Sequence, residues 1–286
     1  MTATRKMVLA GLGVFATALV FALWIGVRHQ RHERSALIDR LTRTASADGV
    51  APIGSPELDK LPAPVARYLR RALGSNRPLQ LVRLKQLGTL RTDVRSERWM
   101  SFEADHLIAP RSTGFAWDAR VRVAPLLHVR VLDSLVEGRG SGQVSLLSAF
   151  TVAEDTGTPE MNSGSLHRYL AEAVWYPTAL LPSATLRWSA IDTDSALATL
   201  TDHGVSVSLE FRFSDTGEVT GIYTPARWGS FDGGYKQVPW EGHFGSYEEK
   251  TGLFVPTEGE VGWYFDNEWQ AVWKGRITAF EAQRAN

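Results

Sequence analysis

From Leu79 to the C-terminus, apolar side chains recur at every second residue in short runs that turn residues separate. Because side chains of a strand alternate between the two faces of a sheet, this period predicts β-strands. In the run 205–213, the alternate residues Val205, Val207, Leu209, Phe211 and Phe213 fall on one face, and an Asp-Thr-Gly turn follows. We expect twelve strands, near residues 79–90, 97–106, 113–123, 126–134, 137–151, 185–191, 196–201, 205–213, 218–228, 238–248, 253–264 and 268–281.

The number of strands limits the fold. Strands joined by short turns pair antiparallel with their neighbours, and strongly twisted open sheets rarely exceed about ten strands. The fold class we predict is therefore mainly β: a large curved antiparallel sheet that forms a half-barrel or barrel.

A helical pattern interrupts the strands at residues 165–176. The segment Asn162–Ser165 offers capping side chains and Pro177 ends the pattern. Apolar residues form one stripe of this helix, at Leu166, Tyr169, Leu170, Ala173 and Val174. A helix with one apolar face needs a surface to cover, so we expect it to plug the concave side of the sheet.

A second constraint is the uncharged run Met7–Val27 near the N-terminus. Its 21 residues make a helix of roughly 31 Å, close to the bilayer core thickness of about 30 Å. Basic residues flank both ends and Trp24 lies near the second boundary. The run is longer than the apolar part of a signal peptide, which is typically 7–15 residues. We therefore expect one uncleaved transmembrane helix, with a buried soluble helix and a cleaved signal as the alternatives.

The expected organisation has three parts. Residues 1–27 are the tail and transmembrane anchor, residues 28–60 a linker with a short helix at Glu33–Thr42, and residues 61–286 the β-rich domain. Positive charge after the anchor favours a cytoplasmic domain, whereas the short basic tail before it is typical of a signal-anchor. We expect a single-pass cell-membrane protein with its domain on the extracytoplasmic side.

Composition excludes several function classes. Lys plus Arg and Asp plus Glu each total 31, so no global field attracts nucleic acid, and we expect no nucleic-acid partner. The absence of cysteine excludes disulfides, thiolate metal sites and cysteine nucleophiles. None of the five histidines after the anchor region, at 106, 128, 167, 203 and 243, has a compact metal-ligand spacing, and no phosphate-binding loop occurs, so we expect neither a metal nor a cofactor. The expected partners are the lipid bilayer and a lipid-like ligand; no sequence feature indicates a protein partner.

The helical interruption carries a family resemblance. The segment from Arg168 to Ala173, followed by Trp175 and Pro177–Pro182, resembles the signature of an uncharacterised bacterial family with a domain of unknown function, often found behind membrane helices. Further matching pieces occur at Leu61–Leu69 and Trp240–Tyr247. The resemblance implies no activity. The order of strands, helix and strands also resembles the envelope lipoprotein-carrier fold, which implies a curved sheet around an apolar cavity; a fold alone does not assign function.

Nine of the ten tryptophans follow the anchor and are spread over most of the strands. They indicate either ordinary core packing or a wide apolar lining. We assign no catalytic residue. The ligand-binding candidates lie on the helix or on strands expected to face it, and they are Trp117, Asp133, His167, Arg168, Tyr169, Glu172, Trp175 and Trp188.

These residues suit a membrane-tethered module that binds an apolar or lipid-like ligand beneath the helix. The aromatic rings would line the site, and Arg168 and Glu172 would fix the helix or contact a polar headgroup. Two alternatives stay open: an envelope enzyme that uses Glu172, Asp133 or His167 as acid or base, and a structural scaffold for a partner protein.

Overall fold

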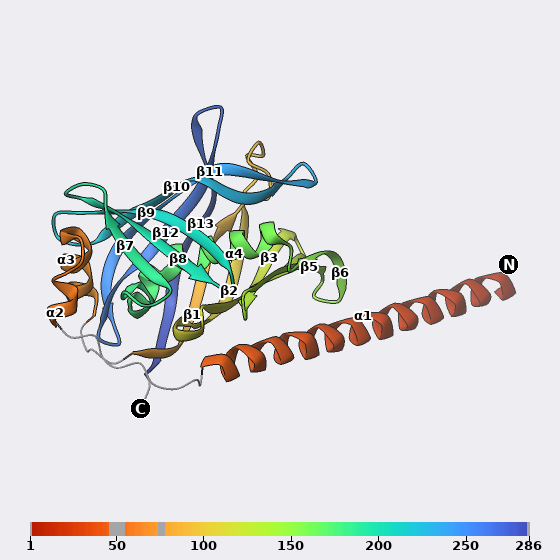
Figure 1. The fold of residues 1–286 in the computed structure, drawn as a ribbon. Coiled ribbons are helices and arrows are strands. Elements are labelled where there is room, and N and C mark those ends of the chain that lie inside the picture. Colours follow the sequence, from red (N-terminus) through yellow and green to blue (C-terminus); the bar gives the residue numbers. More distant parts are fainter. Residues whose placement is uncertain (1, 46–54, 74–77, 285–286) are drawn as a thin grey trace.

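The computed structural model describes residues 2–45, 55–73 and 78–284, and one curved antiparallel sheet of 13 strands dominates it (Figure 1). The strand order is β6-β5-β4-β3-β2-β1-β13-β12-β11-β10-β9-β8-β7. The strands are β1 (Leu79–Leu90), β2 (Met100–Ala109), β3 (Gly114–Ala124), β4 (Leu127–Val136), β5 (Arg139–Leu146), β6 (Phe150–Thr156), β7 (Leu186–Ala190), β8 (Ser195–Asp202), β9 (Val205–Phe213), β10 (Val219–Phe231), β11 (Gly234–Lys250), β12 (Leu253–Phe265) and β13 (Glu268–Arg284). The predicted curved half-barrel is confirmed.

The sheet consists of two meanders that meet at the pairing of β1 with β13. The chain moves outward from β1 to the edge strand β6, crosses to the other edge at β7, and returns inward to β13. The crossing segment therefore has to pass over one face of the sheet, and it contains the helix α4 (Pro159–Glu172).

One predicted strand is two strands in the structure. The run 137–151 divides into β5 and β6, because Leu147 and Ser148 adopt positive φ angles of 53° and 55° and form a tight turn. No glycine or proline marks this turn in the sequence, so the alternating pattern alone could not locate it.

Helix α4 covers the concave face, as predicted, but it begins earlier than the sequence indicated. The side chain of Thr158 accepts a hydrogen bond from the backbone N–H of Met161 and caps the helix, and Pro159 occupies the first turn. Asn162, predicted as a cap, lies inside the helix, where its side-chain oxygen accepts a hydrogen bond from the backbone N–H of Gly140 in β5. After Glu172 the chain tightens into the 3-10 turns η2 (Ala173–Trp175) and η3 (Pro177–Leu180).

The predicted apolar stripe of α4 is buried in the main core. Leu166, Tyr169, Leu170, Ala173 and Val174 are each at most 2% exposed. They pack among residues of the concave face together with the short helix α3 (Ala63–Ala72). The first turn of α3 contains Pro64. Helix α2 (Ser55–Leu58) precedes α3.

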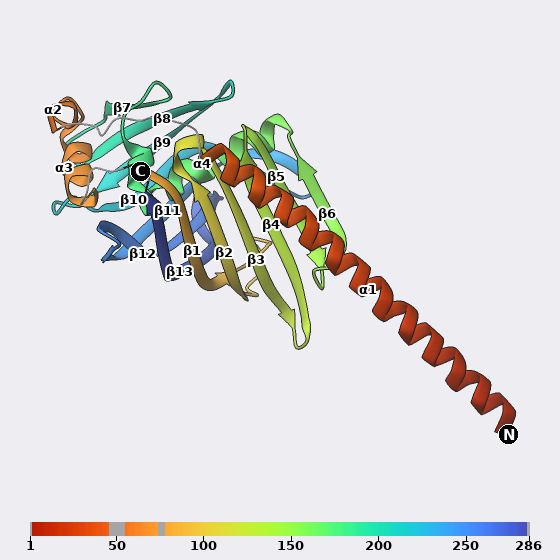
Figure 2. The same cartoon turned by 90° about the horizontal axis from the view of Figure 1, so that it is seen from below.

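The N-terminal helix α1 (Thr2–Ala45) is continuous and extends away from the domain (Figures 1 and 2). The helix expected at Glu33–Thr42 is its C-terminal part, because neither glycine nor proline interrupts the chain between Val27 and Ala45. Its residues Leu37, Ile38 and Leu41 pack in a second apolar cluster on the outer face of the sheet. Residues 46–54 of the expected linker lie outside the described residues.

Candidate functional site

An ionic network lies where α4 meets the concave face of the sheet. Arg168 of α4 donates a hydrogen bond from Nη1 to Asp133 Oδ2 of β4, at 2.8 Å, and another from Nε to Glu172 Oε1, also at 2.8 Å. The side chains keep 19% (Arg168), 32% (Asp133) and 15% (Glu172) of their surface exposed. The network is thus partly buried and still reachable from solvent.

Two glycines allow α4 to lie this close to the strands. A Cβ at Gly140 of β5 would lie 2.6 Å from Ser165 Oγ, and a Cβ at Gly164 of α4 would lie 3.0 Å from the carbonyl oxygen of Trp228 in β10. Both contacts are closer than ordinary van der Waals separations. The absence of side chains at these two positions therefore allows α4 to pack closely on β5 and β10.

The surroundings of the network shift the pKa values of its two carboxyl groups. Burial raises the pKa of Glu172 and of Asp133, whereas the charge and hydrogen bonds of Arg168 act in the opposite direction. Glu172 Oε2 has no hydrogen-bond partner in the described part of the chain. Glu172 is consequently a carboxyl group that holds a proton more readily than an exposed one.

Aromatic rings flank the network. The guanidinium carbon of Arg168 lies 5.1 Å from the ring centre of Phe115 and 4.8 Å from that of Trp117, within the range of cation–π contact. The indole N–H of Trp117 donates to Gln86 Oε1 at 2.8 Å, and Gln86 is 2% exposed. This buried hydrogen bond holds the ring in place under the guanidinium.

A second guanidinium, that of Arg227 in β10, lies near the first. Its carbon is 4.4 Å from the ring centre of Trp240 and 5.0 Å from that of Trp263, and its Nη2 donates to the carbonyl oxygen of Gly164 at 3.0 Å. Among the described residues no carboxylate oxygen lies within ion-pair distance of Arg227. Burial and the neighbouring charge of Arg168 lower its pKa to about 9, so it remains a cation at neutral pH.

Further unpaired polar atoms occur beside Glu172. His106 of β2 is 1% exposed, and neither ring nitrogen makes a hydrogen bond within the described structure. Its Nε2 lies 3.5 Å from Glu172 Oε2. The ring of Trp175 lies edge-on to that of His106, and its indole N–H is likewise buried and unpartnered. Unpaired buried polar atoms are costly, so their concentration here favours a site that binds a polar group.

The structure brings five of the eight predicted site residues together: Trp117, Asp133, Arg168, Glu172 and Trp175. The other three lie apart from the network. His167 Nδ1 is 3.1 Å from the carbonyl oxygen of Ser163, and burial, with the charge of Arg227 acting in the same direction, lowers its pKa to about 4. Tyr169 donates its hydroxyl to the Pro110 carbonyl oxygen at 2.7 Å, and Trp188 packs on Phe211.

Sequence reasoning missed Arg227 and His106. In β10 the period of two places Ile222 and Thr224 on the concave face, and continued alternation would turn Arg227 outward. A register shift between Thr224 and Arg227 inserts one extra residue and turns Arg227 inward. The only local signal is Pro225, a residue typical of bulges. In β2 the period of two places His106 on the concave face, but a lone histidine has no spacing that indicates a function.

The described residues contain no cluster of three or more His, Cys, Asp or Glu that could hold a metal ion.

The concave face also carries large rings that are only partly buried. Trp273 stacks with Phe102 at 5.7 Å between ring centres and lies 6.3 Å from Trp175; Trp175 also lies 6.4 Å from Phe244. Phe244 and Trp273 are partly exposed at the margin of the core. An aromatic surface therefore continues from the ionic network toward solvent.

Comparison with known proteins gives a family and two structural likenesses. The sequence profile of a family of unknown function (DUF6544) matches residues 51–275. The fold is similar to that of a LolA superfamily protein from Nitrosomonas europaea, with 10% identity, 83% of this chain and 96% of that chain covered, and a TM-score of 0.39. It is also similar to a beta-barrel-like protein of a domain of unknown function (DUF1849) from Brucella abortus, with 10% identity, 72% and 99% covered, and a TM-score of 0.24. No curated protein matches the sequence.

Proposed function

The chain belongs to the DUF6544 family of unknown function, and we propose that it is a membrane-tethered module that binds an amphiphile with an apolar body and an anionic head. The observation that carries this proposal is Arg227, a guanidinium that contacts two tryptophan rings and has no carboxylate within ion-pair distance among the described residues. Guanidinium groups bind carboxylates and phosphates through paired N–H donors.

The apolar part of the ligand would lie on the aromatic surface formed by Phe102, Trp175, Phe244 and Trp273. Binding pockets are typically apolar with a few polar groups that fix orientation, and this surface ends at Arg168 and Arg227. Asp133 and Glu172 neutralise Arg168 and hold it in position, which leaves Arg227 as the cation available to the headgroup.

The tether would be α1. It is the helix of the described residues that is long and apolar enough to cross a membrane. Val14, Phe15 and Val20 are each more than 60% exposed, so the domain does not bury the apolar run. We propose that this run spans the bilayer and that the domain lies on the extracytoplasmic side.

Two probes with the same alkyl chain and opposite headgroups test the proposed site: dodecyl phosphate and dodecyltrimethylammonium. The full chain in lipid nanodiscs is incubated with each probe, and native mass spectrometry counts the molecules retained. We expect one dodecyl phosphate per chain and no retained ammonium probe. Equal retention of both probes, or of neither, would contradict the proposal.

Variants locate the headgroup. Arg227→Met removes charge-assisted hydrogen bonds worth about 1.5–3 kcal/mol, which corresponds to roughly a tenfold or greater loss of affinity. Arg227→Lys keeps the charge and retains part of the binding. Arg187→Met, on an exposed residue of β7, serves as the control and leaves binding unchanged. A chemically altered probe in the mass spectrum would instead favour the enzymatic alternative, with Glu172 as its acid or base.

A further inference from the structure

Two hairpin ends of the domain expose large apolar side chains. In the β3–β4 turn Leu126 is fully exposed and Leu127 is 38% exposed, and in β6, beside the β5–β6 turn, Phe150 is 39% and Val152 61% exposed. The β8–β9 turn, in contrast, carries polar residues at Asp202–Gly204. We call Leu126, Leu127, Phe150 and Val152 the hairpin edge.

The two halves of the hairpin edge are joined. His128 Nε2 lies 3.1 Å from Ser148 Oγ, and the backbone N–H of Leu147 donates to the carbonyl oxygen of His128 at 3.0 Å. Leu126 adopts a positive φ of 64°, a conformation that an L-residue with a bulky side chain rarely takes. The tight turns hold the apolar side chains outward instead of allowing them to fold back on the sheet.

The hairpin edge lies where the apolar run of α1 ends. A Cβ at Gly26 would lie 2.5 Å from the carbonyl oxygen of Ala149, and Gln30 Nε2 donates to Thr151 Oγ1 at 3.0 Å. These two contacts bracket Phe150, and Gly26 immediately precedes Val27, the last residue of the uncharged run. Figure 2 shows the β3–β4 and β5–β6 hairpins projecting alongside α1 in the direction of its N-terminus.

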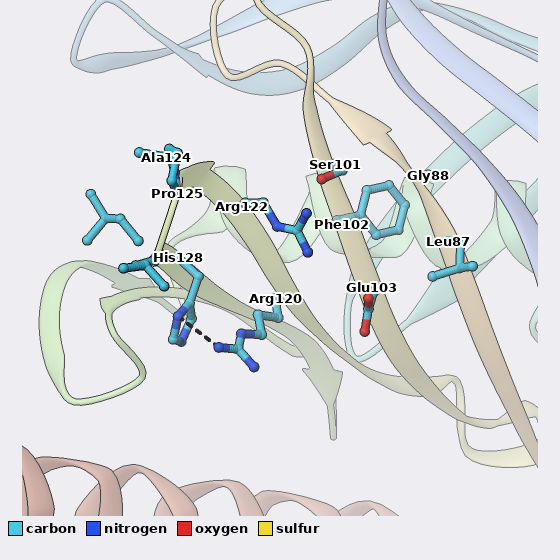
Figure 3. A pocket seen from close by; sticks show the side chains of 12 residues that line it. Leu87, Gly88, Ser101, Phe102, Glu103, Arg120, Arg122, Ala124, Pro125 and His128 are labelled. Atoms are coloured by element: carbon cyan, nitrogen blue, oxygen red, sulfur yellow. Dashed lines mark hydrogen bonds between the residues drawn. The ribbon is translucent and has the colours of Figure 1, made fainter.

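Basic side chains lie directly behind the hairpin edge. A groove of about 760 Å³ includes Leu126, Leu127 and His128 in its lining, with Arg120 and Arg122 along one side and Glu103 opposite (Figure 3). Arg120 and Arg122 are exposed and alternate with the buried Val121, so they point away from the core. Arg28 of α1 is exposed one residue beyond the apolar run. Apolar tips backed by cations match the order of layers at a membrane surface, acyl chains first and anionic headgroups next.

We propose that the hairpin edge inserts into the phospholipid bilayer that α1 crosses, with Arg120 and Arg122 at the headgroups. This inference rests on the membrane-spanning role of α1 proposed above and is independent of the concave site. It assigns the β3–β4 and β5–β6 hairpins as a second membrane contact, which fixes the tilt of the domain. Because α1 packs against the sheet through Leu37, Ile38 and Leu41, the contact would fix the tilt of α1 and the domain together.

Site-specific fluorescence tests the contact. Since the chain contains no cysteine, single substitutions Leu126→Cys and Phe150→Cys can each carry one polarity-sensitive fluorophore. Phe15→Cys reports on the span of α1. Ile191→Cys, an exposed apolar residue of the β7–β8 turn, serves as the matched control. The labelled full-length chains are reconstituted into vesicles of phosphatidylcholine and phosphatidylglycerol, with and without doxyl lipids. The doxyl quencher lies near the headgroup for positions 126, 150 and 191, and near the end of the acyl chain for position 15, which lies near the middle of the apolar run.

We expect a blue shift and loss of fluorescence on adding doxyl lipid at positions 126 and 150, and no change at 191. Quenching at 15 without quenching at 126 and 150 would refute the hairpin contact and leave the tether intact. A blue shift at 126 and 150 without quenching would also refute it, because a protein surface would then cover the hairpins. Absence of quenching at 15 would refute the tether and with it this inference. None of these results depends on the retention of dodecyl phosphate.

Discussion

Replacing Arg168 with methionine would leave Asp133 and Glu172 without the cation that bonds both. Removing one partner of a buried ion pair typically costs about 3–5 kcal/mol, because an uncompensated charge stays behind. The side chain of Asp133 is 32% exposed to solvent and that of Glu172 is 15% exposed. Since water reaches both carboxylates, we expect a loss near the lower limit, about 3 kcal/mol in the free energy of unfolding. Methionine retains most of the volume of the arginine stem, so the loss reports mainly on charge.

The loss should also depend on pH, with a sign set by the carboxyl groups. Burial raises the pKa of both, and Arg168 opposes that rise. Without Arg168 the folded protein holds these protons to higher pH than the unfolded chain, whose carboxyl pKa values are about 4. A raised folded-state pKa contributes stability at low pH that is lost as the pH rises through it. The difference between Arg168→Met and the parent should therefore be larger at pH 8 than at pH 5.

Urea unfolding of the full chain in detergent micelles, followed by tryptophan fluorescence, measures both effects. Arg187→Met, on an exposed residue, should change the free energy of unfolding by less than about 0.5 kcal/mol. The triple variant with Asp133→Asn and Glu172→Gln added should recover most of the loss, because no charge then remains uncompensated. A loss for Arg168→Met below about 1 kcal/mol, or an equal loss at both pH values, would refute the ionic reasoning.

Three further changes test the packing and electrostatics around the site by the same unfolding assay. Trp175→Phe removes an indole N–H that has no partner among the described residues, so it should lower the free energy of unfolding by less than about 1 kcal/mol. Trp175→Ala should lower it by about 3–5 kcal/mol. Equal losses for the two variants would show that the indole N–H has a hydrogen-bond partner. Gly140→Ala should lower the free energy of unfolding by about 1–3 kcal/mol, because its Cβ would lie 2.6 Å from Ser165 Oγ. Gly245→Ala, whose Cβ would have no atom within 4 Å, should lower it much less. An unchanged stability of Gly140→Ala would mean that α4 can shift without loss of packing. Burial, with a contribution from Arg168, holds the pKa of His106 well below its usual value, so His106 destabilises the fold as the pH falls below about 6.5. His106→Phe should therefore reduce the dependence of the free energy of unfolding on pH in that range. An unchanged pH dependence would contradict the burial of a neutral ring.

The sequence alone determined the fold class and most of the elements. Alternation and turn residues located eleven of the strands, and the apolar stripe from Leu166 to Val174 placed α4 on the concave face, because these signals are local. The pairing of Arg168 with Glu172 could also be predicted from a local signal, because residues four apart on a helix are neighbours.

Only the tertiary structure decided which distant residues share the site. The bulge after Thr224 reverses the face of Arg227, and the turn at Leu147–Ser148 divides one predicted strand, yet neither feature has a strong local signal. The approach of α4 to β5 depends on what lies opposite Gly140, and the hairpin edge becomes visible only when α1 is placed beside Ala149. Local periodicity determines which residues form a strand or helix, whereas register and the packing of segments far apart in the chain determine which side chains meet.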